Sequence, residues 1–296
     1  MNLPRYPIYI PSKGRAKMCY TARFLIDDDV PFFLVIEEQE HESYARIYGD
    51  ERLLVLPFRD KGSVIPARNW IKEHATEQGF ERHWQLDDNI KQIDRLYKGK
   101  KIKTNSAAGF CSVEDFTDRY KNIAISGMNY SMFAYSGSTV VPPFFLNCRV
   151  YSCSLIFNSI PNQWRGKYNE DTDICLQVLA DGWCTVLINV FLIRKIRTMQ
   201  MKGGNTDEIY KGDGRLEMAR SLERLWPGVV KTGRRFQRPQ HVVHDAWRKF
   251  DTQLEFKDEF DPEKIKERNE YGLKLKQVAP EVRSDYLKKL LKEKDE

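Results

Sequence analysis

The stretch VIPARNWIKEHATEQGFERHWQLDDN (residues 64–89) contains a helix pattern followed directly by a strand pattern. The first part predicts a helix that ends near Gly79, and ERHWQLDD (81–88) predicts a strand. This strand ends in two carboxylates and an amide, Asp87, Asp88 and Asn89. Burying such groups without partners costs several kcal/mol each. They therefore lie either in a solvated turn or beside something cationic.

Strand and helix patterns alternate on the N-terminal side of this stretch. Apolar strands are predicted at 6–11, 30–36 and 52–58, with helical spacing between them. Such alternation predicts βαβ units, an α/β fold and a mainly parallel central sheet flanked by helices. Ligands of α/β sheets bind at the carboxyl ends of the strands. The segments 12–15 and 87–89 both follow strands, so we expect both at that edge.

The remainder divides into an irregular middle and a charged end. Strands are predicted within 121–135, 147–159 and 184–193, and a helix within 172–182. We expect one domain over 1–250, divided into a first half of about 1–105 and a second half of about 106–250. Residues 251–296 are rich in both charges, and Asp261-Pro262 is typical of a helix start. We expect a helical C-terminal appendage there.

The composition suits a globular protein with a substantial core, because 41% of the 296 residues are apolar and 12% are aromatic. No apolar run approaches the roughly 20 residues that span a bilayer. The N-terminus lacks the pattern of a signal peptide. These features predict a protein of the cytoplasm without a membrane partner. The six cysteines are scattered, which favours reduced, buried thiols over a zinc site or disulfides.

Positive charge is clustered in two segments. Residues 89–103 carry six Lys or Arg, and residues 229–249 carry six more with aromatic residues between them. Such clusters suit polyanions, although each is also compatible with a solvated surface. For DNA binding, the candidates are Arg234, Arg235, Arg238 and Lys249.

A second acidic cluster, NEDTD (169–173), lies about 80 residues after the first, at the start of a predicted helix. Acidic residues there can simply cap the helix. Together the clusters offer a different chemistry. Mg²⁺ or Mn²⁺ takes hard oxygen ligands and bridges phosphate oxygens, and a separate carboxylate can act as a general base.

These pieces, in this order, resemble the GT-A (Rossmann-like) class of nucleotide-sugar glycosyltransferases. The matching segments are IPSKGRA (10–16), PARNW (66–70), LDDN (86–89) and NEDTD. NEDTDICLQVLADGW (169–183) with VFLIRKIRTMQMKGGNT (190–206) is most similar to the phage TET-associated glycosyltransferases. That group is thought to glycosylate 5-hydroxymethylcytosine in DNA. The resemblance covers residues 5 to 200, and LDDN departs from the D-x-D metal motif because Asn89 replaces its last Asp.

The resemblance implies that the first half of the domain, about 1–105, binds the nucleotide-sugar and that the second, about 106–250, binds the acceptor. It also implies a role for each matching residue. Asp171 is the expected base, with Glu170 positioning it or the acceptor. Donor contacts are expected from Ser12, Lys13, Arg15, Arg68, Asn69 and Asp87. A divalent metal, Mn²⁺ or Mg²⁺, is expected at Asp87, Asp88 and Asn89, completed by His241 or His244. The expected donor is a UDP-sugar. The segment 199–214, rich in Gly and polar residues, is either a loop that closes over the donor or an ordinary connector.

Three other functions remain open at this stage. A transferase acting on a polysaccharide, lipid or protein needs the same carboxylates but no basic surface. A nucleotidyltransferase usually has a Gly-rich loop after the first strand, where this chain has a single Gly. A non-catalytic nucleic-acid-binding module accounts for the basic segments but not for the acidic clusters, since carboxylates repel phosphate.

Overall fold

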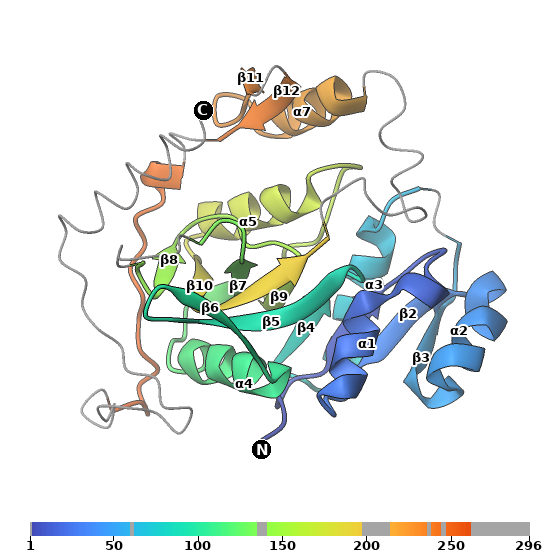
Figure 1. Ribbon diagram of the computed structural model, residues 1–296. Coiled ribbons are helices and arrows are strands. Elements are labelled where there is room, and N and C mark those ends of the chain that lie inside the picture. The colour runs from blue at the N-terminus through green and yellow to red at the C-terminus, as the bar shows by residue number, and fades with distance from the viewer. Residues whose placement is uncertain are drawn as a thin grey trace.

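The computed structural model describes residues 2–59, 62–134, 141–196, 214–235, 238–243 and 247–261. A single large mixed sheet runs through the molecule with helices on both faces (Figure 1). None of the helices in the described residues is long and apolar enough to cross a membrane.

The N-terminal part consists of βαβ units, as predicted. Its strands are β1 (Ile8–Pro11), β2 (Phe33–Glu37), β3 (Leu53–Leu56) and β4 (Arg82–Leu86). Its helices are α1 (Tyr20–Asp27), α2 (His41–Tyr48) and α3 (Ile65–Glu77). Short 3-10 turns occur at Ala16–Met18, Glu38–Glu40 and Asp50–Arg52. The four strands pair in parallel in the order β3-β2-β1-β4, so the carboxyl ends of β1 and β4 are neighbours.

The second part makes the sheet mixed, and here the prediction of a mainly parallel sheet is wrong. Its strands are β5 (Ile90–Tyr97), β6 (Lys100–Thr104), β7 (Ile123–Tyr130), β8 (Phe144–Leu146), β9 (Cys153–Phe157) and β10 (Cys184–Lys195). The sheet continues β4-β9-β7-β10-β5-β6, and β8 pairs with β10. β9 runs antiparallel to both β4 and β7, and β5 is antiparallel to β6 and β10. Only β7 and β10 pair in parallel here.

The hairpin between β5 and β6 explains part of this difference. Lys98 and Gly99 both have positive φ, of 47° and 72°, and form a tight two-residue connection. Turns of this kind match the twist of antiparallel strands. Residues 89–103 stand out in the sequence only as a basic cluster, and the sequence therefore does not predict these two strands.

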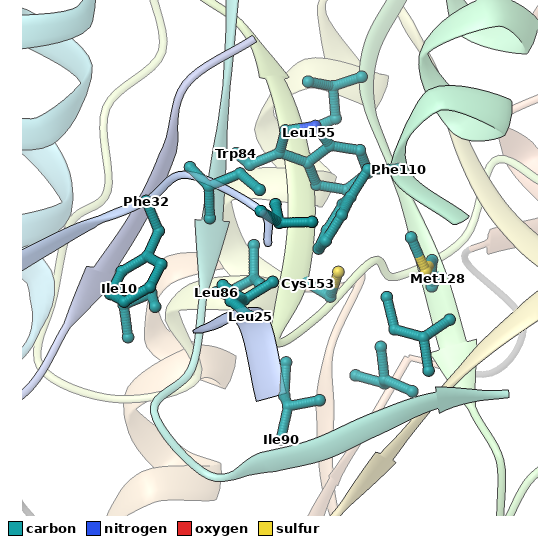
Figure 2. Packing of buried hydrophobic residues seen from close by; sticks show 14 of the residues in the cluster. Ile10, Leu25, Phe32, Trp84, Leu86, Ile90, Phe110, Met128, Cys153 and Leu155 are labelled. Carbon is teal, nitrogen blue, oxygen red and sulfur yellow. The ribbon is translucent and has the colours of Figure 1, made fainter. Parts of the chain in front are cut away.

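The core lies in two layers, one on each face of the sheet. On one face, α1, α2 and α4 (Ser106–Thr117) cover apolar side chains of the strands, and Trp84 meets Phe110 edge-on at 4.9 Å between ring centres (Figure 2). On the other face lie α3 and α5 (Glu170–Ala180). Burial of large side chains on both faces, at about 25 cal/mol per Å² of apolar surface, fixes the strands and therefore the positions of their ends.

The C-terminal part packs on the outside of α5. It contains α7 (Gly214–Leu225), β11 (Lys231–Arg235), β12 (Arg238–Val242) and a 3-10 turn at Trp247–Lys249. Leu222 and Val230 are buried against Leu176 of α5, so α7 and the β11–β12 hairpin lie beyond α5 at the top of Figure 1. Residues 251–261 run along the main body, where Phe256 bridges to Tyr120. The helical appendage predicted over 251–296 is therefore wrong for 251–261, where no helix occurs, and the rest of it lies outside the described residues.

Candidate functional site

The acidic turn after β4 is held on two sides by backbone contacts. From α1, the Thr21 hydroxyl donates to the Asp87 carbonyl at 2.5 Å and accepts from the Ile90 amide at 3.0 Å. From the segment before β9, the Ser152 carbonyl accepts from the Asp87 amide at 2.8 Å. These anchors exclude the solvated turn and direct both carboxylates into the protein.

Asp88 is tied to the loop after β1. Its carboxylate accepts from Ser12 Oγ at 2.9 Å and from an Arg15 guanidinium nitrogen at 2.7 Å. The Ser12 hydroxyl is also bonded to the Tyr44 hydroxyl at 2.7 Å. Burial raises the pKa of Asp88, although Arg15 and Ser12 oppose it. The two strand-end segments selected from the sequence therefore meet, while neighbouring Lys13 pairs with Glu37 at 2.7 Å.

Asp87 lies among three donors that come from distant segments. Arg68 donates at 3.1 Å, Ser152 Oγ donates at 2.7 Å, and the Lys195 ammonium forms a further ion pair. Burial disfavours the charge on Asp87, but Lys195 and Arg68 outweigh it and lower the pKa to about 2. Asp87 is therefore a fixed anion between two fixed cations.

Arg68 connects the two acidic clusters. It is 3% exposed on α3 and bonded to Gln85 at 3.1 Å. The same guanidinium nitrogen that reaches Asp87 lies 3.7 Å from both Glu170 and Asp171 at the start of α5. Clusters about 80 residues apart in the sequence therefore form one charged site.

The charges of this site do not cancel. Three carboxylates, Asp87, Glu170 and Asp171, surround two cations, Arg68 and Lys195. Burial, reinforced by Glu170 and Asp87, raises the pKa of Asp171 to about 7, against the opposing effect of Arg68 and Lys195. The Asp171 carboxyl is thus only partly ionised at neutral pH, unlike an ordinary Asp with a pKa of about 3.9. A carboxylate of this kind is well matched to proton transfer near pH 7.

Two other polar residues of the predicted segments have structural partners. Asn69 donates to the Trp164 carbonyl at 2.8 Å and accepts from its amide at 2.9 Å. Asp173 is fully buried and accepts from Arg165 at 3.1 Å and from the Trp226 indole at 2.6 Å. Both fix the packing around the start of α5.

The residues expected to hold a metal do not fit one in this arrangement. Both oxygens of Asp87 and both oxygens of Asp88 accept from protein donors. Asn89 Oδ1 is buried with no hydrogen-bond partner in the described part of the chain. One amide oxygen is not sufficient to bind a divalent metal, which takes several oxygen ligands. Among the described residues, no group of three or more His, Cys, Asp or Glu side chains is arranged to bind a metal.

The structure describes only one of the two histidines that were predicted as metal ligands. His241 lies on β12, where burial and the neighbouring Arg149 lower its pKa to about 4. His244 lies outside the described residues, as does most of the candidate loop 199–214.

The basic residues chosen for DNA lie on and after the β11–β12 hairpin. The side chains of Arg234, Arg238 and Lys249 are exposed there. Arg235 pairs with Arg238 through the backbone, and its side chain is outside the described part. The other basic segment forms the β5–β6 hairpin, which begins directly after Asn89.

Sequence reasoning missed Lys195, Ser152 and Tyr130. Lys195 ends β10, which is parallel to β7, and it bonds to Ser152 Oγ at 2.8 Å and to the Tyr130 hydroxyl at 3.2 Å. Lys195 could have been found in the sequence, because it is a cation at the end of a long apolar strand. Ser152 has a left-handed backbone conformation, with φ of 62°, which only the structure reveals.

Solved structures with similar chain paths belong to several kinds of protein. A197 from STIV is 12% identical, with a TM-score of 0.41 over 65% of this chain and 86% of that one. The inositol-1-phosphate CTP transferase from T. maritima is 9% identical, with a TM-score of 0.39 over 66% and 91%. At TM-scores below 0.5 these likenesses carry no argument about function. No curated protein matches the sequence.

The sequence profile of one family matches the chain over most of its length. The profile of the TET-Associated Glycosyltransferase family (TAGT) covers residues 6–204, which are 199 of the 296 residues. This range includes Ser12, Arg68, Asp87, Asp171 and Lys195, and hence the whole charged site described above. The chain therefore belongs to the TET-associated glycosyltransferase family.

Proposed function

We propose that this glycosyltransferase moves a sugar from a nucleotide-sugar, a UDP-sugar, to the hydroxyl of a modified DNA base, 5-hydroxymethylcytosine in phage DNA. The observation that carries the proposal is the single site formed around Arg68. It combines fixed cations, suited to a diphosphate, with one carboxyl of raised pKa, suited to an acceptor hydroxyl.

The donor side of the site is the carboxyl edge of β1 and β4. Ser12, Lys13 and Arg15 follow β1 and face the nucleotide in this proposal, and Arg68 and Asp87 orient the diphosphate end. Diphosphate departure develops negative charge, and preorganised cations stabilise such charge more effectively in a buried site than in water. Protein donors already occupy the oxygens of Asp87 and Asp88, so the fixed cations of the protein supply this positive charge.

The acceptor side is the start of α5. Asp171 takes the proton of the acceptor hydroxyl as the oxygen attacks the anomeric carbon, and Glu170 holds the acceptor or the base. Arg68 lies 3.7 Å from both carboxylates, so it keeps them close to the donor edge. A base with a pKa of about 7 is ionised in a large fraction of molecules at neutral pH and still accepts a proton readily.

The DNA part of the proposal is supported by exposed positive charge. Arg234, Arg238 and Lys249, with Arg235 on the same hairpin, are assigned to the phosphate backbone. A base within a duplex must leave the stack before its hydroxymethyl group can approach Asp171. A polysaccharide, lipid or protein acceptor is the alternative, and it makes no use of this surface.

A nucleoside analysis tests the proposal directly. Duplex DNA with 5-hydroxymethylcytosine is incubated with the protein and a panel of nucleotide sugars, then digested and analysed by mass spectrometry. We expect a hexose mass on the modified nucleoside, none on unmodified DNA, and far less product with Asp171→Asn after the same incubation time. Donor turnover without any nucleoside product would reject DNA as the acceptor while leaving the transferase intact.

A further inference from the structure

The Lys195 ammonium is the least expected group in the site. It is the last residue of β10, and its side chain is 12% exposed. Its three N–H groups match three acceptors: the carboxylate of Asp87, the Ser152 hydroxyl at 2.8 Å and the Tyr130 hydroxyl at 3.2 Å. The two hydroxyls are themselves linked at 2.6 Å. The ammonium is therefore held in a defined position.

The surroundings keep Lys195 charged. Burial alone would lower its pKa, but the pairing with Asp87 outweighs burial and raises the pKa above the ordinary value. The face of the Tyr130 ring lies 5.5 Å from the ammonium and adds a favourable contact with a cation. A permanent positive charge thus lies at the strand edge where nucleotide phosphates bind in α/β folds.

A divalent cation at Asp87 would compete with Lys195 for the same oxygen. Displacing the ammonium would leave a mostly buried lysine without its anion, which is strongly destabilising. Displacing Arg68 instead would separate that buried guanidinium from Asp87. The protein already supplies at this carboxylate the charge that a metal would bring.

We propose that Lys195 is a catalytic residue that takes the place of a divalent metal, by binding the diphosphate of the donor and stabilising it as it leaves. This inference rests on the proposed transferase function. In the reaction, the bond between the anomeric carbon and the diphosphate oxygen breaks, and its electron pair stays on that oxygen. The acceptor oxygen forms the new bond, and its proton passes to Asp171. The N–H now shared with Tyr130, at the longest of the three contacts, is the one that turns to the diphosphate.

Binding of nucleoside diphosphates tests the inference without any acceptor. A panel of UDP, CDP, GDP and ADP is titrated calorimetrically into wild type, Lys195→Met and Lys195→Arg, in EDTA and in Mn²⁺. We expect wild type to bind its nucleotide equally well in both buffers. Lys195→Met should bind at least about 10-fold more weakly in EDTA, and Mn²⁺ should recover part of the affinity because no cation then competes for Asp87 Oδ2, which keeps only the Ser152 hydroxyl as a donor. Lys195→Arg should retain most of the EDTA affinity.

Sugar transfer in EDTA provides the second measurement. Removal of one preorganised donor to a developing anion lowers the chemical step by about 10²–10³-fold, which is the drop expected for Lys195→Met. Arg194→Gln is the matched control, because Arg194 precedes Lys195 but pairs with Asp94 at 2.9 Å. Thermal unfolding verifies that each variant is folded. If Lys195→Met is unfolded, comparison of wild type in the two buffers and the Lys195→Arg variant decide the question.

The outcomes separate this inference from the proposed function. Wild type that binds a nucleotide only with Mn²⁺, or Lys195→Met that binds and transfers as wild type does in EDTA, overturns the role of Lys195 alone. Failure to bind any of the four nucleotides in either buffer overturns the proposed function and this inference with it.

Discussion

Replacing Asp171 by Asn should make the protein more stable and much less active. The native carboxyl has its pKa raised from 3.8 to about 7, mainly by burial, so its ionised form is disfavoured in the folded state. Each pKa unit corresponds to about 1.4 kcal/mol, which gives about 4 kcal/mol for a shift of this size. The side chain is 25% exposed and water screens part of the effect, so we expect about 2–4 kcal/mol.

The sign follows from proton binding. Between pH 4 and pH 7 the folded protein keeps a proton on Asp171 that the unfolded chain has released, so stability falls as pH rises through this window. Asn cannot ionise and avoids this decrease. Asp171→Asn should therefore match wild type near pH 4 and exceed it by about 2–4 kcal/mol at pH 8. Removal of an acidic residue from the first turn of α5 costs only about 0.3–1 kcal/mol, so the gain prevails.

Urea denaturation at pH 5 and pH 8, beside single-turnover transfer, measures both effects. Transfer should fall by about 10²–10⁴-fold, and the wild-type rate should rise with pH to half its maximum near pH 7. Asp173→Asn is the control from the same helix turn. It weakens a buried carboxylate bonded to Arg165 and Trp226 and should lower stability by about 1–3 kcal/mol. A variant Asp171→Asn that is less stable than wild type at both pH values would show an ionised helix-end residue and refute the raised pKa. Transfer by this variant at the wild-type rate would refute the assignment as base.

Three further outcomes are expected. Asp87→Asn removes the anion between Arg68 and Lys195, so donor affinity measured by calorimetry should fall sharply; normal affinity would mean that the acidic turn has no part in donor binding. The double variant Arg234→Ala and Arg238→Ala should make DNA binding less sensitive to salt. The slope of log K against log salt should become shallower by about 0.9 for each phosphate that the variant no longer neutralises. An unchanged slope would mean that DNA binds to another surface. Gly127→Ala should destabilise the fold by about 1–3 kcal/mol in thermal or urea unfolding, because a Cβ at this position would collide with the Cys153 carbonyl. Wild-type stability of this variant would mean that β9 can shift to make room.

Local pattern was sufficient for the first half of the molecule. The alternation of strands and helices up to β4 predicted the βαβ units, and the strand-end rule correctly joined Ser12 and Arg15 to the acidic turn. This succeeded because parallel βαβ units place all their carboxyl ends at one edge, so sequence position alone implies proximity.

The second half depended on contacts that local pattern does not encode. The antiparallel strand β9 enters between β4 and β7, and it brings Ser152 to Asp87. Lys195 reaches the same carboxylate from 108 residues away. Neither the partner strand nor its register can be read from a single apolar run, because pairing is chosen by the packing of the whole sheet.

The sequence alone therefore indicated the acidic residues of the candidate site, since Asp87, Asp88, Glu170 and Asp171 are recognisable by type and by their place at element ends. Their protonation and their partners were decided by the tertiary structure. Lys195 and Arg68 outweigh burial and lower the pKa of Asp87 to about 2, whereas burial prevails at Asp171 and raises its pKa to about 7, although both are aspartates at predicted element ends. The physical reason is that an electrostatic environment is the sum over all charges and all excluded water around a group, and folding brings these together from every part of the chain.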